Sequence, residues 1–128
     1  MTRKRNPSHG WTNDETWTVA SVIENNEALH ETTVNEASLA MTKALAGGAK
    51  TQRDLSTAAT ADLARALRKR FEAAHDRVTS SVYTMFRNTK VGRDELDIAG
   101  ALLMLARVAV DKTNWKEVAG HYVSGFQG

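Results

Sequence analysis

The sequence predicts an all-α fold, a compact bundle of about five helices in one domain. Apolar residues recur at three- and four-residue spacing over most of the chain, which is the period of an amphipathic helix. No stretch alternates apolar and polar residues for long enough to form a sheet. The chain has 128 residues, 41% hydrophobic and 25% charged, as expected of one globular domain. We therefore expect a flexible basic arm over residues 1–10 and a single helical domain over residues 11–128.

The first two helices are predicted from their start and stop signals. Thr12 opens a Thr-Asn-Asp-Glu capping box that ends at Glu15, so a helix should run from about Asn13 to about His30. A second helix is expected over about 33–46, where Gly47-Gly48 supplies the stop. The residues expected to face the core are Trp17, Val19, Ala20, Ile23, Val34, Ala37, Met41, Ala44 and Leu45.

The middle of the chain predicts a loop followed by one long amphipathic helix. Residues 49–60 are rich in Thr, Ser and Ala and are expected to form a loop with a short turn. The helix should cover about 61–87, with a bend near 79–81, where Thr79, Ser80 and Ser81 are weak helix formers. Its apolar stripe consists of Leu63, Ala66, Leu67, Phe71, Ala74, Val78, Val82, Met85 and Phe86.

Two further helices complete the predicted bundle. The segment from about Asp94 to about Lys112 is apolar nearly all round, which predicts the central element of the core. A turn over 88–92 should precede it. The last helix is expected to follow Thr113 or Asn114 and to turn Trp115, Val118, Ala119, Tyr122 and Phe126 inward.

Composition restricts the kinds of function. The absence of cysteine excludes a disulfide framework, a thiolate metal site and a cysteine nucleophile. The longest apolar run, Ala99 to Ala106, is much shorter than a bilayer span, and no apolar stretch follows the basic N-terminus as it does in a signal peptide. We therefore expect a cytoplasmic protein that does not engage a membrane.

Charge is segregated along the chain, although the net charge is only +2. Residues 11–42 carry six acids and no Lys or Arg, whereas residues 43–93 carry eleven Lys or Arg and four acids. One interpretation is that acidic and basic helices pack beside each other. The other is that a basic face stays free for a nucleic acid or an acidic protein.

The two ends of the chain carry its most distinctive motifs. One is Gly10-Trp11-Thr12-Asn13-Asp14-Glu15-Thr16-Trp17-Thr18-Val19 with Asn25-Asn26-Glu27 downstream, and the other is Asn114-Trp115-Lys116-Glu117-Val118-Ala119-Gly120-His121-Tyr122. They resemble a family of small uncharacterised proteins encoded by phages, plasmids and haloarchaea. Its members open with G-W-x-N-x-x-T-W-x-V and close with N-W-x-E-[IV]-A-x-H. The resemblance implies an origin in a mobile element and implies no particular chemistry.

The tryptophans of these motifs have two interpretations. Trp11 beside a helix start and Trp17 on the apolar stripe are suited to anchoring the chain ends in the core, with Trp115 packed against them. Alternatively, Trp11 and Trp17 belong to a surface that binds a partner, where Trp and Arg contribute most to affinity.

Glu-x-x-His pairs occur at Glu27/His30 and at Glu72/His75, a spacing that di-iron and di-manganese bundles use. Such a centre also needs an inward Glu from each of two more helices, and only Glu36, Glu95 and Glu117 are available. Glu72 and His75 share a helix face with Arg68 and Thr79, which we expect to be exposed to solvent. We therefore expect no metal and no other cofactor.

Two further patterns are weak. Residues 51–55 followed by 61–70 are faintly similar to a helix-turn-helix but lack a turn glycine. Residues 47–51 end in Lys-Thr but lack the glycine spacing of a phosphate loop. Ser, His and Asp occur in no recognisable nucleophile setting, so we expect no enzymatic activity.

These observations give one functional hypothesis and two alternatives. The hypothesis is a non-catalytic phage or mobile-element accessory protein that binds a host or defence-system protein in the host cytoplasm. Its candidate partner-binding residues are Trp11, Trp17, Arg65, Arg68, Lys69, Arg70 and Arg77. The first alternative is a nucleic-acid-binding accessory protein that uses the 65–77 basic face together with Arg3, Lys4 and Arg5. The second is a virion or self-assembling component, and a homo-oligomer is compatible with each.

Overall fold

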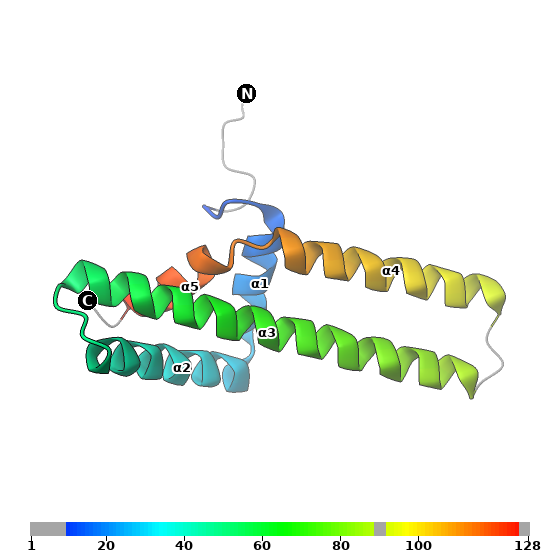
Figure 1. Ribbon diagram of the computed structural model, residues 1–128. Helices are drawn as coiled ribbons and strands as arrows, with labels where there is room; N and C mark the ends of the chain where they lie inside the picture. Colours follow the sequence, from blue (N-terminus) through cyan, green and yellow to red (C-terminus); the bar gives the residue numbers. More distant parts are fainter. Residues whose placement is uncertain (1–9, 89–91, 126–128) are drawn as a thin grey trace, which may run out of the picture. The chain divides into compact units, whose positions relative to one another are not determined.

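The computed structural model describes residues 10–88 and 92–125, and in these ranges it contains five α-helices and no strand (Figure 1). The predicted all-α fold of about five helices is therefore confirmed. Most of the predicted basic arm, including Arg3, Lys4 and Arg5, lies outside the described residues, as does Phe126. The helices are α1 (Asp14–Asn25), α2 (Glu27–Ala46), α3 (Gln52–Arg87), α4 (Arg93–Lys112) and α5 (Trp115–Ser124).

The first helix is shorter than predicted because an asparagine interrupts it. Asn26 adopts an extended conformation, and its side chain accepts a hydrogen bond from the Leu29 backbone N–H, so it ends α1 and caps α2. The predicted boundary near His30 was wrong. The start also differs by one residue. Asn13, rather than Thr12, is the N-cap of α1 and accepts from the Thr16 N–H.

The predicted stop of the second helix is confirmed, but the loop after it is shorter than expected. Gly48 has φ +100°, and the Ala49 N–H donates to the Ala44 carbonyl, as in a glycine-terminated helix. Thr51 then caps α3 by accepting from the Asp54 N–H, so most of the predicted 49–60 loop is helical. The helix does not break near Thr79, Ser80 and Ser81, since it continues to Arg87. The Thr79 hydroxyl donates to the His75 carbonyl one turn earlier.

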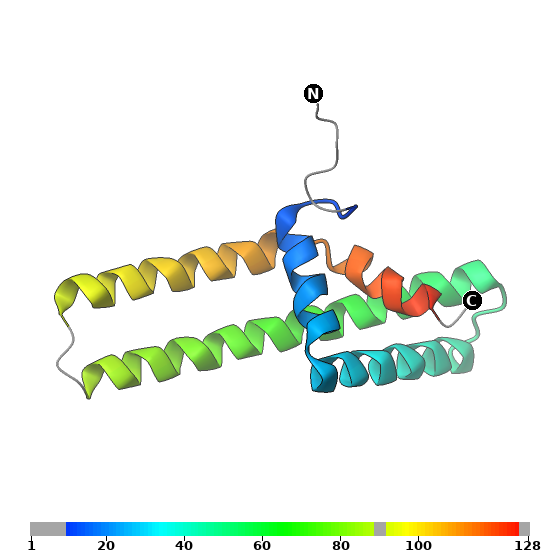
Figure 2. The ribbon, with the colours of Figure 1, turned by 180° about the vertical axis from the view of Figure 1, so that it is seen from behind.

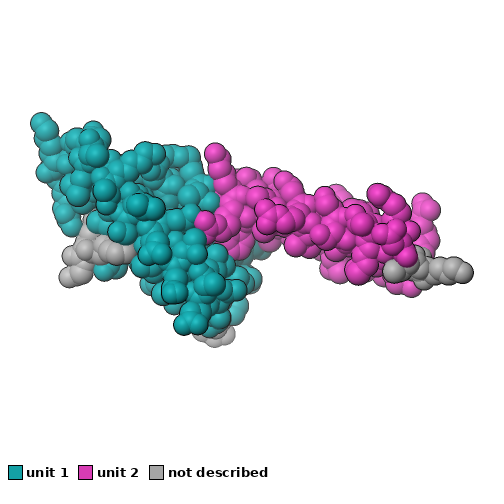
Figure 3. All heavy atoms as spheres, turned by 90° about the horizontal axis from the view of Figure 1, so that it is seen from below, with its two compact units in different colours: residues 1–67, 113–128 teal, residues 68–112 magenta. Residues whose placement is uncertain are grey.

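The chain divides into two compact units, coloured separately in Figure 3. Unit 1 consists of residues 1–67 and 113–128, and unit 2 of residues 68–112. Helix α3 supplies its first part to unit 1 and its second part to unit 2.

Unit 1 contains the apolar core. Helices α1, α2 and α5 contact one another, and α2 lies alongside the first part of α3, where Lys43 forms an ion pair with Asp62 (Figure 2). The inward residues predicted for α5 are confirmed up to Tyr122, and Val19, Ala20 and Ile23 of α1 are buried as predicted. The largest fully enclosed side chains are those of Thr16, Ile23, Thr33, Leu63, Leu67, Val118 and Val123.

Unit 2 is an antiparallel hairpin in which the second part of α3 pairs with α4. Arg68 contacts Asp111, and His75, which comes later in α3, contacts Leu103, which comes earlier in α4. The two helices therefore run in opposite directions. Among the described residues of unit 2, only Val110 is buried. The prediction that 94–112 is the central core element was therefore wrong, because most of its apolar side chains face solvent in this chain.

Packing of unit 1 predicts that truncating a buried leucine lowers the free energy of unfolding far more than truncating an exposed one. Leu63→Ala removes a buried side chain and should lower the free energy of unfolding by about 2–5 kcal/mol, through lost burial and the cavity left behind. The measurement is chemical denaturation followed by circular dichroism. Leu39→Ala in the exposed part of α2 is the control and should stay within about 0.5 kcal/mol of the parent. Equal losses for the two variants would contradict the assignment of the core.

Candidate functional site

The two terminal motifs meet in unit 1 through the start of α1 and the start of α5. The buried Thr16 hydroxyl donates to the Asn13 side-chain oxygen at 2.6 Å and accepts from the Asn114 backbone N–H at 2.8 Å. Asn114 in turn caps α5 by accepting from the Glu117 N–H. The Thr12 N–H donates to the Glu117 carboxylate at 3.1 Å. We call this set, residues 12, 13, 16, 114 and 117, the terminal clasp.

The tryptophans are placed around the terminal clasp in three different ways. Trp115 is buried in the core of unit 1, as predicted. Trp11 is half-buried, and its ring meets the His121 ring edge to face at a centroid distance of 5.7 Å. Trp17 is 37% exposed, so its predicted inward orientation holds only for part of the side chain. Trp11 and Trp115 have contacts within unit 1 that explain them.

The terminal clasp predicts that the Thr16 hydroxyl is important for stability. Thr16→Val keeps the shape of the side chain but leaves the part-buried Asn114 N–H without its acceptor, so the variant should lose about 1–3 kcal/mol. Thr18→Val is the matched control, because the Thr18 hydroxyl is exposed and donates only to a carbonyl within α1. Thermal and chemical unfolding provide the measurement. A Thr16→Val variant as stable as Thr18→Val would show that the clasp does not hold the two ends together.

A second polar group in unit 1 surrounds Glu24. The Tyr122 hydroxyl donates to the Glu24 carboxylate at 2.7 Å, and the Nε2 atoms of His30 and His121 lie 3.9 and 3.7 Å from the same oxygen. The Tyr122 ring also packs edge to face against both imidazoles. Burial of the hydroxyl, followed by its hydrogen bond to and the charge of Glu24, raises the pKa of Tyr122 well above the ordinary 10.0. The His30 imidazole thus lies beside the Glu24 carboxylate.

This raised pKa predicts a loss of stability in alkali. The folded chain keeps Tyr122 neutral, while the unfolded chain ionises it near pH 10.0, so its contribution is complete below that pH and declines as pH rises above it. Tyr122→Phe should therefore unfold with less dependence on pH between about 9 and 11 than the parent. Tyr83→Phe, which alters an exposed tyrosine, should retain the parent slope. Identical slopes for Tyr122→Phe and the parent would refute the assignment.

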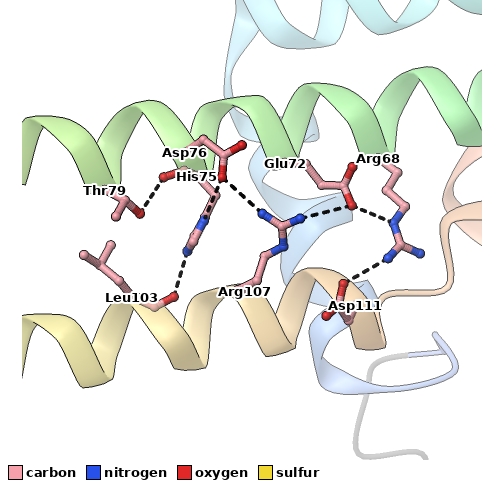
Figure 4. A network of polar contacts seen from close by, with 8 residues as sticks. All are labelled: Arg68, Glu72, His75, Asp76, Thr79, Leu103, Arg107 and Asp111. Atoms are coloured by element: carbon pink, nitrogen blue, oxygen red, sulfur yellow. Dashed lines mark hydrogen bonds and ion pairs between the residues drawn. The ribbon is translucent and has the colours of Figure 1, made fainter.

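In unit 2 a network of charged and polar groups joins α3 to α4 (Figure 4). Arg107 lies between Glu72 at 3.5 Å and Asp76 at 3.2 Å. Arg68 contacts Glu72 at 3.1 Å and Asp111 at 2.9 Å. This face of α3 was predicted to be exposed to solvent, and that prediction was wrong because it is the face that pairs with α4.

His75 lies at the most enclosed point of this network. Its Nε2 is 2.7 Å from the Leu103 carbonyl oxygen, so Nε2 carries the proton that it donates. Its Nδ1 is buried without a hydrogen-bond partner and lies 3.8 Å from the Asp76 carboxylate. A histidine thus occupies a position where an apolar side chain would be usual between two packed helices.

The predicted basic residues do not share one face of α3. Arg65 and Lys69 are four residues apart and lie on one side, whereas Arg70 and Arg77 are seven apart and lie on another. Arg65 forms an ion pair with Asp62, and Arg68 pairs with two acids. Lys69 and Arg77 are exposed, and Arg70 is partly buried. The charges of Arg65 and Arg68 are therefore partly neutralised by neighbouring carboxylates.

The most prominent surface feature of unit 2 is apolar and was missed by the sequence analysis. Val78 and Met85 of α3 are exposed, and so are the larger apolar side chains along the outer side of α4. The periodicity that located these residues was correct. Periodicity alone does not show which side of a helix is covered by other elements. The sequence-based prediction had placed the apolar side in the core. The exposed residues are Val78, Met85, Ile98, Leu102, Met104, Leu105 and Val108.

Sites for metals and membranes were also considered. Within residues 10–88 and 92–125, no group of three or more His, Asp or Glu side chains is arranged to hold a metal ion. In the same ranges, no helix combines the length and the apolarity needed to cross a bilayer.

Comparison with known proteins found no matching family model, no similar curated protein and no similar solved structure.

Proposed function

We propose that this chain is a non-catalytic accessory protein of phage or mobile-element origin that binds a host or defence-system protein in the host cytoplasm. The observation that supports binding is the exposed apolar surface of unit 2. The proposed origin comes from the two terminal motifs and their resemblance to the phage, plasmid and haloarchaeal family.

The proposed contact surface lies on the second part of α3, and we call it the α3 patch. It is a shallow hollow of about 390 Å³, and its lining residues are Ala74, Arg77, Val78, Ser81, Val82 and Met85. Apolar side chains next to an arginine are typical of the energetically important centre of a protein interface. The α3 patch therefore suits an apolar partner segment that carries an acidic residue opposite Arg77.

The polar pairing inside the hairpin explains why this patch is exposed. Helix α3 turns Arg68, Glu72 and His75 toward α4. Its apolar residues are therefore displaced to a side of the helix that α4 does not cover. Exposing Val78 and Met85 has an energetic cost in water, and a partner that buries them recovers it.

The proposal predicts that a charge in the α3 patch abolishes capture of the partner. A tagged copy of the 128-residue chain, expressed in host cells, should retain one stoichiometric protein after nuclease treatment. Val78→Glu should reduce this retention at least tenfold, because a carboxylate at the centre of an apolar contact must be desolvated. Quantitative mass spectrometry of the captured material is the measurement.

Val22→Glu is the matched control for this experiment. Val22 is 46% exposed on α1 of unit 1 and Val78 is 52% exposed, so both variants place the same charge at a similarly exposed valine. The control should capture the partner normally, and both variants should keep the helix content of the parent. Equal capture by the two variants would contradict the α3 patch. Nucleic acid retained with a steep dependence on salt would instead support the nucleic-acid-binding alternative.

A further inference from the structure

The outer side of α4 is a separate apolar surface on the hairpin. Met104 is 72% exposed and Leu105 is 64% exposed, and Ile98, Leu102 and Val108 are exposed as well. Arg107 points toward α3, where it contacts Glu72 and Asp76. Ile98 and Leu105 lie nine and two residues from Arg107, so at about 100° per residue they project from the opposite side of the helix. Helix α4 thus pairs with α3 through one side and presents apolar side chains on the other.

The residues on this outer side follow the spacing of a coiled coil. Asp94, Ile98, Ala101, Leu105, Val108 and Lys112 are alternately four and three residues apart, and we call this row the α4 seam. Alternating spacing of this kind keeps one row of side chains facing a partner helix along its whole length. The apolar members occupy the middle of the seam, and an acid and a base occupy its two ends.

We propose that the α4 seam packs antiparallel against the α4 seam of a second copy of this chain, around a two-fold axis at the level of Leu103. In this register Ile98 faces Val108 of the second copy, and Ala101 faces its Leu105. Asp94 faces Lys112 of the second copy at both ends. Each contact occurs twice, as a two-fold interface requires.

Charge complementarity selects the antiparallel orientation. A parallel pair would place Asp94 against Asp94 and Lys112 against Lys112, which is repulsive at both ends. The antiparallel pair converts both contacts into attractions and also opposes the two helix dipoles favourably. Two acids that flank the seam have cationic neighbours within the same chain, since Asp97 lies 3.8 Å from Arg93 and Asp111 lies 2.9 Å from Arg68.

This inference goes beyond the proposed function, because it concerns a different helix and a different occupant. The α3 patch receives the partner protein, and the α4 seam receives a second copy. Variants in the two surfaces therefore test the two proposals separately.

Sedimentation equilibrium of the 128-residue chain tests the dimer. The parent should have twice the 14.0 kDa mass of the chain at micromolar concentration. Leu105→Glu should be monomeric, with its dissociation constant weakened at least a hundredfold, because two carboxylates would be buried next to the axis. Leu39→Glu is the matched control at a leucine that is 68% exposed in unit 1, and it should remain dimeric. A monomeric parent, or a dimeric Leu105→Glu of normal helix content, would overturn the proposal.

Cross-linking tests the orientation and register, since the chain has no cysteine of its own. Ile98→Cys and Val108→Cys are each made alone, and a short bismaleimide is added to each variant and to their mixture. In the proposed register, position 98 lies about 15 Å along the axis from its own equivalent but directly opposite position 108. The mixture should therefore yield a covalent dimer and each variant alone should not. A dimer from either variant alone, or none from the mixture, would overturn the antiparallel register.

Discussion

One buried hydroxyl group joins the beginning of the fold to its end. Thr16 is fully buried. Its hydroxyl oxygen accepts a hydrogen bond from the backbone N–H of Asn114, the N-cap residue of α5. The same hydroxyl donates to the side chain of Asn13, the N-cap residue of α1. Two helix starts that are distant in sequence thus share one polar atom. Because α5 contacts both α1 and α2, fixing its start relative to α1 also sets how Val118 and Val123 enter the core of unit 1. Both motif segments therefore contribute residues to this packing.

The two units are stabilised by different physical interactions. Unit 1 encloses aliphatic side chains such as Ile23 and Leu67, so its stability comes mainly from removing apolar surface from water. Unit 2 places Arg107, Glu72 and His75 between its helices, and many of its larger aliphatic side chains are exposed. Two paired helices enclose little interior. The exposed apolar side chains of unit 2 can therefore bury more surface against another molecule than within the hairpin. This reversal is the strongest indication that unit 2 is built for association.

Much of the fold could be predicted from the sequence, because helical spacing and end signals are local properties. The glycine pair at 47–48 and the inward side of α5 were located correctly from such signals. The break at Asn26 was missed because an asparagine within a favourable helical pattern is ambiguous until its side chain is seen to cap the next turn. Thr51 was missed for the same reason, since only the bond from Asp54 distinguishes a cap from a loop residue.

The proposed binding surfaces were harder to predict than the helices. The pattern of α4 correctly predicted a helix that contains Leu102 and Leu105, but burial depends on what lies opposite them, which is not a local property. The same reasoning misplaced Glu72 and His75, since charged residues usually face water and here they face a neighbouring helix. The candidate basic residues were predicted to form one face over residues 65–77, whereas they lie on different sides of α3 and Arg65 and Arg68 have acidic neighbours.

The charged contacts that join α3 to α4 make the response to ionic strength different in the two units. Added electrolyte shields the partly exposed attractions of Arg68 and Arg107, while the enclosed aliphatic interior around Ile23 is insensitive to it. At the same time, electrolytes that are excluded from protein surfaces favour covering exposed aliphatic groups such as Leu105. Concentrated sulfate should therefore weaken the charged contacts within the hairpin and favour the proposed association through its exposed aliphatic groups.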